Sequence, residues 1–101
     1  MKLFMFENEE HSATKEINAL NNVLEELNEN LYKENNKLSI LKDKYDGIAP
    51  MQFEYAIGTA EYNYCMNKIA NAQTQYYQQY YKTQRIQHQI SEVQHEIGLL
   101  Q

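Results

Sequence analysis

The side chains that could carry chemistry are one cysteine, three histidines and several carboxylates. His88 and His95 are seven residues apart and share a helix face, but two turns separate them by about 10 Å. That is too far to bind one metal ion, and His11 is remote from both in the sequence. Cys65 has no histidine near it, although a reactive thiolate needs such a partner. We therefore expect no metal site and no nucleophile, and a small metal-binding protein remains only as an alternative.

The carboxylate pairs give no better case for catalysis. Glu25-Glu26 and the pair Glu92 and Glu96 lie on predicted helix surfaces, where carboxylates are solvated. The chain contains no Gly-rich phosphate loop, and two helices alone form no concave pocket. We predict that the protein is not an enzyme, with no catalytic residue and no cofactor.

A run of tyrosines over residues 76–81 could stack on the bases of single-stranded nucleic acid. The only cations beside it are Lys82 and Arg85, and the formal net charge of the chain is -5. Because binding to a phosphate backbone needs clustered lysines and arginines, we do not expect nucleic acid as a partner.

A repeating apolar pattern covers the first half of the chain. Its steps alternate between four and three residues, which is typical of the seam of a coiled coil. Its single polar member, Glu34, either lies near an edge or hydrogen-bonds a tyrosine, or it fixes register as buried polar residues can. The predicted seam of this first helix is Ala13, Ile17, Leu20, Leu24, Leu27, Leu31, Glu34, Leu38, Leu41 and Tyr45.

Helix breakers gather in one place, and the only proline is Pro50. Gly47 suits the left-handed position that closes a helix, and Pro50 suits the first turn of the next one. We predict an all-α fold in which two long helices form an antiparallel coiled-coil hairpin, assembling into a multi-helix bundle. The single domain covers residues 1–101, with an N-terminal segment at 1–11, helices at 12–46 and 51–98, and a turn at 47–50.

Folding the chain at this turn sets a register for the second helix. Glu34 is then expected beside Tyr62, and Leu20 near Tyr76. The second helix outruns the first, at about 70 Å against about 50 Å. Its uncovered apolar end needs either the N-terminal segment at 3–6 folded back on it or another chain. The predicted seam of this helix is Met51, Tyr55, Gly58, Tyr62, Cys65, Ile69, Ala72, Tyr76, Gln79, Thr83, Ile86, Ile90, Val93, Ile97 and Leu100.

Two surfaces of the second helix are therefore predicted to bind a partner. One is the uncovered end of its seam, and the other is a flank of off-seam apolar side chains, which favour contact with another protein. The alternative for the flank is that the tyrosine rings lie along neighbouring side chains with their hydroxyls in water. The predicted partner-binding residues are Met66, Tyr77, Tyr80, Tyr81, Ile86, Ile90, Val93, Ile97 and Leu100.

The triplet Tyr45-Asp46-Gly47 lies between the two predicted helices. With the length of about a hundred residues, it makes the chain similar to the WXG100 family of secreted helical hairpins. Tyrosine replaces the tryptophan of that family, and the Tyr-x-x-x-Asp/Glu pattern that follows its second helix is missing here. The resemblance implies an exported effector as an alternative function.

The leading hypothesis is a non-catalytic coiled-coil interaction protein: a small chaperone, an adaptor or a structural subunit of a secretion-system or phage type of assembly. Its expected partners are further copies of itself, a helical protein, or both, without insertion into a membrane. A single cysteine forms no internal disulfide, which suits the cytoplasm, with export without a cleavable signal peptide as the alternative.

Overall fold

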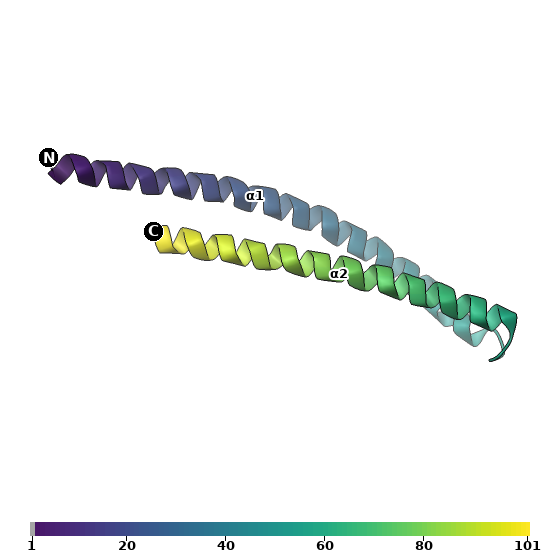
Figure 1. Cartoon of the computed structure of the whole chain (residues 1–101). Coiled ribbons are helices and arrows are strands. Elements are labelled where there is room, and N and C mark those ends of the chain that lie inside the picture. Colours follow the sequence, from purple (N-terminus) through teal and green to yellow (C-terminus); the bar gives the residue numbers. More distant parts are fainter. Residues whose placement is uncertain (1) are drawn as a thin grey trace. The chain divides into compact units, whose positions relative to one another are not determined.

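A computed structural model describes the backbone of residues 2–101 and the side chains of residues 13–101. Over these residues the chain forms helix α1 (Lys2–Ile48), a short 3-10 helix η1 (Ala49–Phe53) and helix α2 (Ala60–Leu100), and it contains no strand. Figure 1 shows α1 and α2 lying side by side, joined by the connection that holds η1. The predicted all-α hairpin of two long helices is confirmed.

The predicted seam of α1 is the face that becomes covered. Each of its ten positions from Ala13 to Tyr45 is half-buried, and every other side chain between them is exposed. Ile48 is also half-buried and extends the same alternation by one step. An apolar repeat of seven residues keeps one stripe of a helix facing its neighbour, and this accounts for the pattern.

The seam of α2 is confirmed from Tyr62 onward. All twelve predicted positions from Tyr62 to Leu100 are buried or half-buried, and Met66 is the only other side chain in that range that is not exposed. The most deeply covered apolar positions include Cys65 and Ala72. Small side chains at the seam let two helix backbones approach closely.

The predicted turn at Asp46–Pro50 is wrong, and so are the helix bounds drawn from it. The first helix begins at Lys2 and continues through Gly47 to Ile48, and the second begins at Ala60 rather than at residue 51. A glycine inside a helix costs about 1 kcal/mol relative to alanine. Covering Ile48 at the next seam position offsets that cost, because its side chain lies beside Ala72 of α2.

The connection occupies residues 49–59, and its conformation follows from local backbone preferences and hydrogen bonds. Pro50 stands in the first turn of η1, where a missing N–H does no harm. Gly58, not Gly47, has the left-handed backbone, with φ of 91°. The hydroxyl of Thr59 accepts a 3.2 Å hydrogen bond from the N–H of Tyr62 and so caps the start of α2. Thr59 Oγ1 also donates to the carbonyl oxygen of Ala56 at 2.7 Å, which ties the cap to the connection.

The chain divides into two compact units. Unit 1 consists of Met1–Leu31 with Arg85–Gln101, and unit 2 consists of Tyr32–Gln84. In unit 2, Glu34 of α1 lies against Gln79 of α2 and not against Tyr62. The predicted register is therefore wrong by 17 positions, the difference between 79 and 62. In an antiparallel hairpin, moving the turn along the chain by one residue shifts every pairing between the helices by about two residues. The observed connection lies later in the chain than the predicted turn, so all the pairings are shifted.

The register also reverses the predicted overhang. In unit 1, Leu20 of α1 lies beside Leu99 and Leu100 at the end of α2, not near Tyr76. The N-terminal end of α1 extends past the end of α2, as Figure 1 shows. Residues 3–6 were one of the two alternatives for covering the end of α2; their side chains lie outside the described residues, and their backbone belongs to α1.

Candidate interaction surfaces

A polar layer interrupts the apolar seam in unit 2. Gln79 donates from Nε2 to Glu34 Oε2 at 2.6 Å and to the Glu34 carbonyl oxygen at 3.0 Å. Lys37 and Lys82 each bring Nζ within 3.3 Å of Glu34 Oε1. Only 12% of the Glu34 side chain is exposed, so these contacts replace water around the carboxylate. Glu34 thus occupies a seam position without leaving its charge unpaired.

The next seam position of α2 holds the most completely covered polar side chain among residues 13–101. Thr83 is 2% exposed, and its hydroxyl donates to the carbonyl oxygen of Tyr80 at 2.6 Å. A threonine that bonds within its own helix satisfies its hydroxyl without a partner on the opposite helix. Thr83 therefore adds a second polar position to the α2 seam, one helical turn after Gln79.

The titration of Glu34 reflects its partners. The hydrogen bond from Gln79 holds the pKa of the Glu34 carboxyl below its usual value, and Lys82 and Lys37 act in the same direction. Burial opposes them, because it disfavours the charged form. The contacts in this layer consequently favour the ionised form of Glu34.

Tyrosine rings form a continuous chain of contacts along α2. Tyr76 and Tyr80 are stacked with ring centroids 6.4 Å apart. Tyr77 packs edge-on against Tyr76 at 5.6 Å, and Tyr81 packs edge-on against Tyr80 at 5.7 Å. We name these four tyrosines together with Met66, which shares the heptad position of Tyr80, the aromatic flank.

The aromatic flank meets α1 at a shallow groove in unit 2. The groove holds about 180 Å³, and three of its six lining residues are tyrosines. On the flank as a whole, Tyr77, Tyr80 and Tyr81 are exposed, as predicted, whereas Met66 is half-buried. The groove is lined by Lys42, Tyr45 and Asp46 from α1 and by Gln73, Tyr76 and Tyr77 from α2.

The remaining predicted partner-binding residues lie on the α2 seam inside unit 1. Ile90 is only 9% exposed, and the other four are half-buried. The reason for predicting them, an end of α2 left without cover, is wrong, because α1 lies alongside to the end of α2. These residues are Ile86, Ile90, Val93, Ile97 and Leu100.

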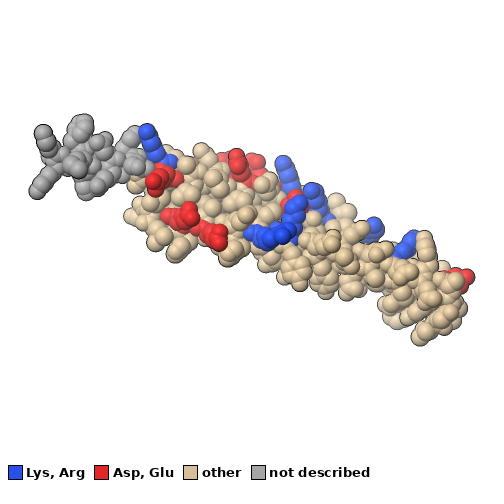
Figure 2. Space-filling view, viewed as in Figure 1, with Lys and Arg blue, Asp and Glu red and all other residues tan. Residues whose placement is uncertain are grey.

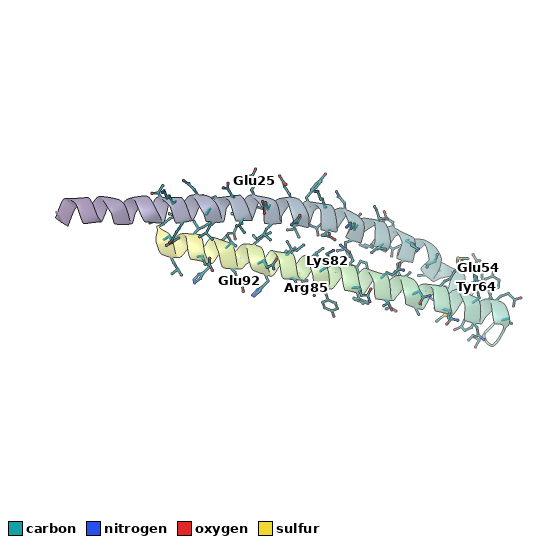
Figure 3. The ribbon with its side chains drawn as sticks, turned by 45° about the horizontal axis from the view of Figure 1, so that its top comes forward. Glu25, Glu54, Tyr64, Lys82, Arg85 and Glu92 are labelled. Carbon is teal, nitrogen blue, oxygen red and sulfur yellow. The ribbon has the colours of Figure 1, made fainter. Side chains whose placement is uncertain are left out.

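The connection exposes two apolar side chains that the sequence analysis missed. Phe53 is 84% exposed and Ile57 is 85% exposed. Placing the start of α2 at residue 51 had counted this segment as helix. The sequence signal that could have corrected it is Gly58-Thr59 followed by Glu61, a helix start with an N-cap and an acid in the first turn. Figure 3 shows Glu54 and Tyr64 at this same end of the hairpin.

The remaining side chains that could react or bind a metal ion do not cluster together. His88 and His95 are exposed, and His88 Nε2 lies 2.9 Å from Glu92 Oε1. Figure 3 shows Glu92 on a side of α2 turned away from α1. Cys65 is buried in the seam as a free thiol. Within residues 13–101 no three His, Cys, Asp or Glu side chains come together as metal ligands would, and the side chain of His11 lies outside that range. In the described part of the chain neither helix has a stretch apolar enough to cross a membrane.

Comparison with protein-family models finds no match for this chain, and comparisons with curated proteins and with solved structures find none either. The triplet Tyr45-Asp46-Gly47, which carried the resemblance to the WXG100 family, lies inside the last turn of α1 rather than in the connection. Function must therefore be argued from the surfaces themselves.

Proposed function

We propose that this chain is a non-catalytic coiled-coil interaction protein that binds a helix of another protein along its aromatic flank. The observation that carries the proposal is the set of contacting tyrosine rings from Tyr76 to Tyr81, which the hairpin leaves partly in water. Tyrosine suits such a surface because its ring gives a large apolar contact while its hydroxyl tolerates solvent. A cluster of exposed rings favours a contact site over isolated surface residues.

The shape of the groove favours a helix as the bound element. It runs between two helices, where a third helix can pack its apolar stripe as in a helical bundle. Tyr45, Tyr76 and Tyr77 would contact that stripe, while Lys42 and Asp46 at the rim offer one charge of each sign. We therefore expect the partner helix to be amphipathic, with polar residues bordering its apolar face.

For the biological role, we propose a small chaperone, an adaptor or a structural subunit of a larger assembly, of the secretion-system or phage type. All three would act through helix packing rather than through chemistry. The cytoplasm is the proposed place of action, which suits the unpaired thiol of Cys65.

The experiment compares capture by three versions of the tagged full chain in its source organism. The wild type is expected to retain a helical protein, and the double variant Tyr77→Ser with Tyr81→Ser is expected to lose it. Tyr64→Ser is the matched control, because Tyr64 is 61% exposed and Tyr81 is 62% exposed, but Tyr64 lies thirteen residues from Tyr77 and so about 140° around α2 from it.

The captured protein is then purified and its binding measured by calorimetry with the same three chains. A loss of at least about tenfold in affinity for the double variant alone would support the proposal. Equal binding by all three chains would overturn it, as would a wild-type chain that captures no protein at all.

A further inference from the structure

Unit 2 has a second groove between its two helices, which we name the lysine groove. It holds about 340 Å³, and two exposed lysines line it, Lys44 from α1 and Lys68 from α2. Half-buried Ile48 and Ala72, which is 3% exposed, give the groove an apolar lining. The complete lining is Lys44 and Ile48 of α1 with Lys68, Asn71, Ala72 and Gln75 of α2.

Neither lysine of this groove is neutralised by the described chain. Lys44 and Lys68 form no ion pair with residues 13–101. Lys68 Nζ lies 4.8 Å from the ring centroid of Tyr64, a contact that leaves the positive charge in place. Two cations at one groove repel each other, so an anion bound at both would relieve that repulsion.

The next lysines on the same two helix faces already bind a carboxylate. Lys37 lies seven residues before Lys44, and Lys82 lies fourteen residues after Lys68, so each keeps the heptad position of its counterpart. Lys37 and Lys82 each bring Nζ within 3.3 Å of Glu34 Oε1, so one carboxylate joins a lysine of α1 to a lysine of α2. Lys44 and Lys68 offer the same two kinds of donor, and no carboxylate within residues 13–101 pairs with them. Lys and Arg side chains, blue in Figure 2, recur along unit 2 on the face that it shows.

We propose that the lysine groove binds an acidic amphipathic helix of another protein. The apolar stripe of that helix would cover Ile48 and Ala72, and carboxylates beside the stripe would pair with Lys44 and Lys68. The row of lysines on α2 sets the length of the partner, because Lys68 and Lys82 are fourteen residues apart, or about 21 Å. A helix of two to three heptads with a carboxylate at every seventh residue fits this row.

The apolar lining favours a protein helix over other anionic partners. A phosphate backbone has no apolar stripe to cover Ile48, and binding it needs clustered lysines and arginines. Recognition of anionic lipid uses clusters of about four to eight cations. Four lysines lie on this face of unit 2, but Lys37 and Lys82 already share Glu34.

This inference goes beyond the proposed function and uses another side of unit 2. Tyr77 lies nine residues from Lys68, about 180° around α2, and Lys42 lies two residues from Lys44, about 200° around α1. Tyr77 and Lys42 both line the groove at the aromatic flank. Unit 2 can thus bind one helix in each groove at the same time.

The test measures binding of labelled synthetic peptides to the full chain by fluorescence anisotropy. The probe is a peptide of about 21 residues, with leucine at both apolar heptad positions and glutamate at the two positions beside them. A second peptide has glutamine in place of every glutamate. At about 150 mM salt, which screens distant charges, the wild type is expected to bind the glutamate peptide at least about tenfold more tightly than the glutamine peptide.

Reversing the charges of the groove should remove this preference. Lys44→Glu with Lys68→Glu is expected to bind the glutamate peptide at least about tenfold more weakly than the wild type. Lys15→Glu with Lys42→Glu is the matched control, because it makes the same change in net charge outside the lysine groove and should bind this peptide like the wild type. A peptide with lysine in place of every glutamate should bind the groove variant more tightly than the control variant, which also shows that the groove variant is folded.

The inference would be overturned by a wild type that binds the glutamate and glutamine peptides equally or binds neither. Equal weakening in the groove and control variants would overturn it as well. Vesicles of phosphatidylserine and single-stranded poly-dT test the other anionic partners, and tighter binding of either, lost in the groove variant, would assign the groove to that partner instead. Tyr77→Ser with Tyr81→Ser should keep the glutamate peptide, so failure of this inference is distinguishable from failure of the proposed function.

Discussion

Gln79 of α2 holds the carboxylate of Glu34 on α1 through a 2.6 Å hydrogen bond. A shift of α2 by one heptad would place Ala72 or Ile86 opposite Glu34, and neither side chain can donate a hydrogen bond. A half-buried carboxylate without a donor is costly. The contact therefore penalises the neighbouring registers of an otherwise apolar seam, as single polar positions do in other coiled coils.

Removing only one member of this pair should destabilise the hairpin. In Gln79→Leu the carboxylate of Glu34 loses its strongest partner while it stays at the seam, and we expect a lower melting temperature by circular dichroism. Replacing both residues, Glu34→Leu with Gln79→Leu, should recover or exceed the wild-type melting temperature, because leucine suits both seam positions. A single variant that melts like the wild type would contradict the role given to the pair.

The polar layer should also make stability depend on pH. The folded state holds the pKa of Glu34 below its unfolded value of about 4.3. Because the folded state binds a proton less readily, this contribution is fully present above the unfolded value and is lost as the pH falls through the folded pKa.

Urea unfolding of the wild type and of Glu34→Gln between about pH 7 and about pH 3 measures this contribution. The difference in unfolding free energy between the two chains should shrink on acidification. Comparing the difference removes the titration of the other carboxylates, and a difference that stays constant over the range would contradict the prediction.

The register makes Ile90 a structural residue. Ile90→Ala should lower the free energy of unfolding by about 2 kcal/mol or more, because Ile90 is buried within unit 1. Ile57→Ala removes the same atoms from a side chain that is 85% exposed, and it should change the unfolding free energy by less than about 0.5 kcal/mol. Urea unfolding monitored by circular dichroism compares the two, and equal effects would argue against the observed register.

The start of α2 depends on the Thr59 cap. Thr59→Ala removes the acceptor for the Tyr62 N–H and should cost about 1 kcal/mol of stability. Thr59→Ser keeps a hydroxyl at the same place and should unfold like the wild type. If α2 instead began at residue 51, neither substitution would act on a cap, and alanine and serine would behave alike.

Much of the fold could be predicted from residue spacing. The steps from Ala13 to Tyr45, and those from Tyr62 to Leu100, place all their members on the covered faces of the helices. The exposure of Tyr77, Tyr80 and Tyr81 was predicted in the same way. These features depend on helix periodicity, which each stretch of sequence expresses by itself.

The turn was harder to predict because two places in the chain satisfy the local rules for ending a helix. Gly47 with Pro50 is one, and Gly58 with Thr59 is the other. Local preferences of about 1 kcal/mol do not decide between them. Covering Ile48 against α2 and pairing Glu34 with Gln79 favour the later place, and both contacts exist only once the helices are packed.

The sequence by itself determined that the chain forms two long helices and which stripe of each helix is covered. Only the tertiary structure decided the register and, with it, the partner of Glu34 and the cover over Ile90. The physical reason is that a heptad pattern is nearly unchanged when one helix slides by seven residues. Register depends on contacts between residues far apart in the sequence, and these contacts form only in the folded hairpin.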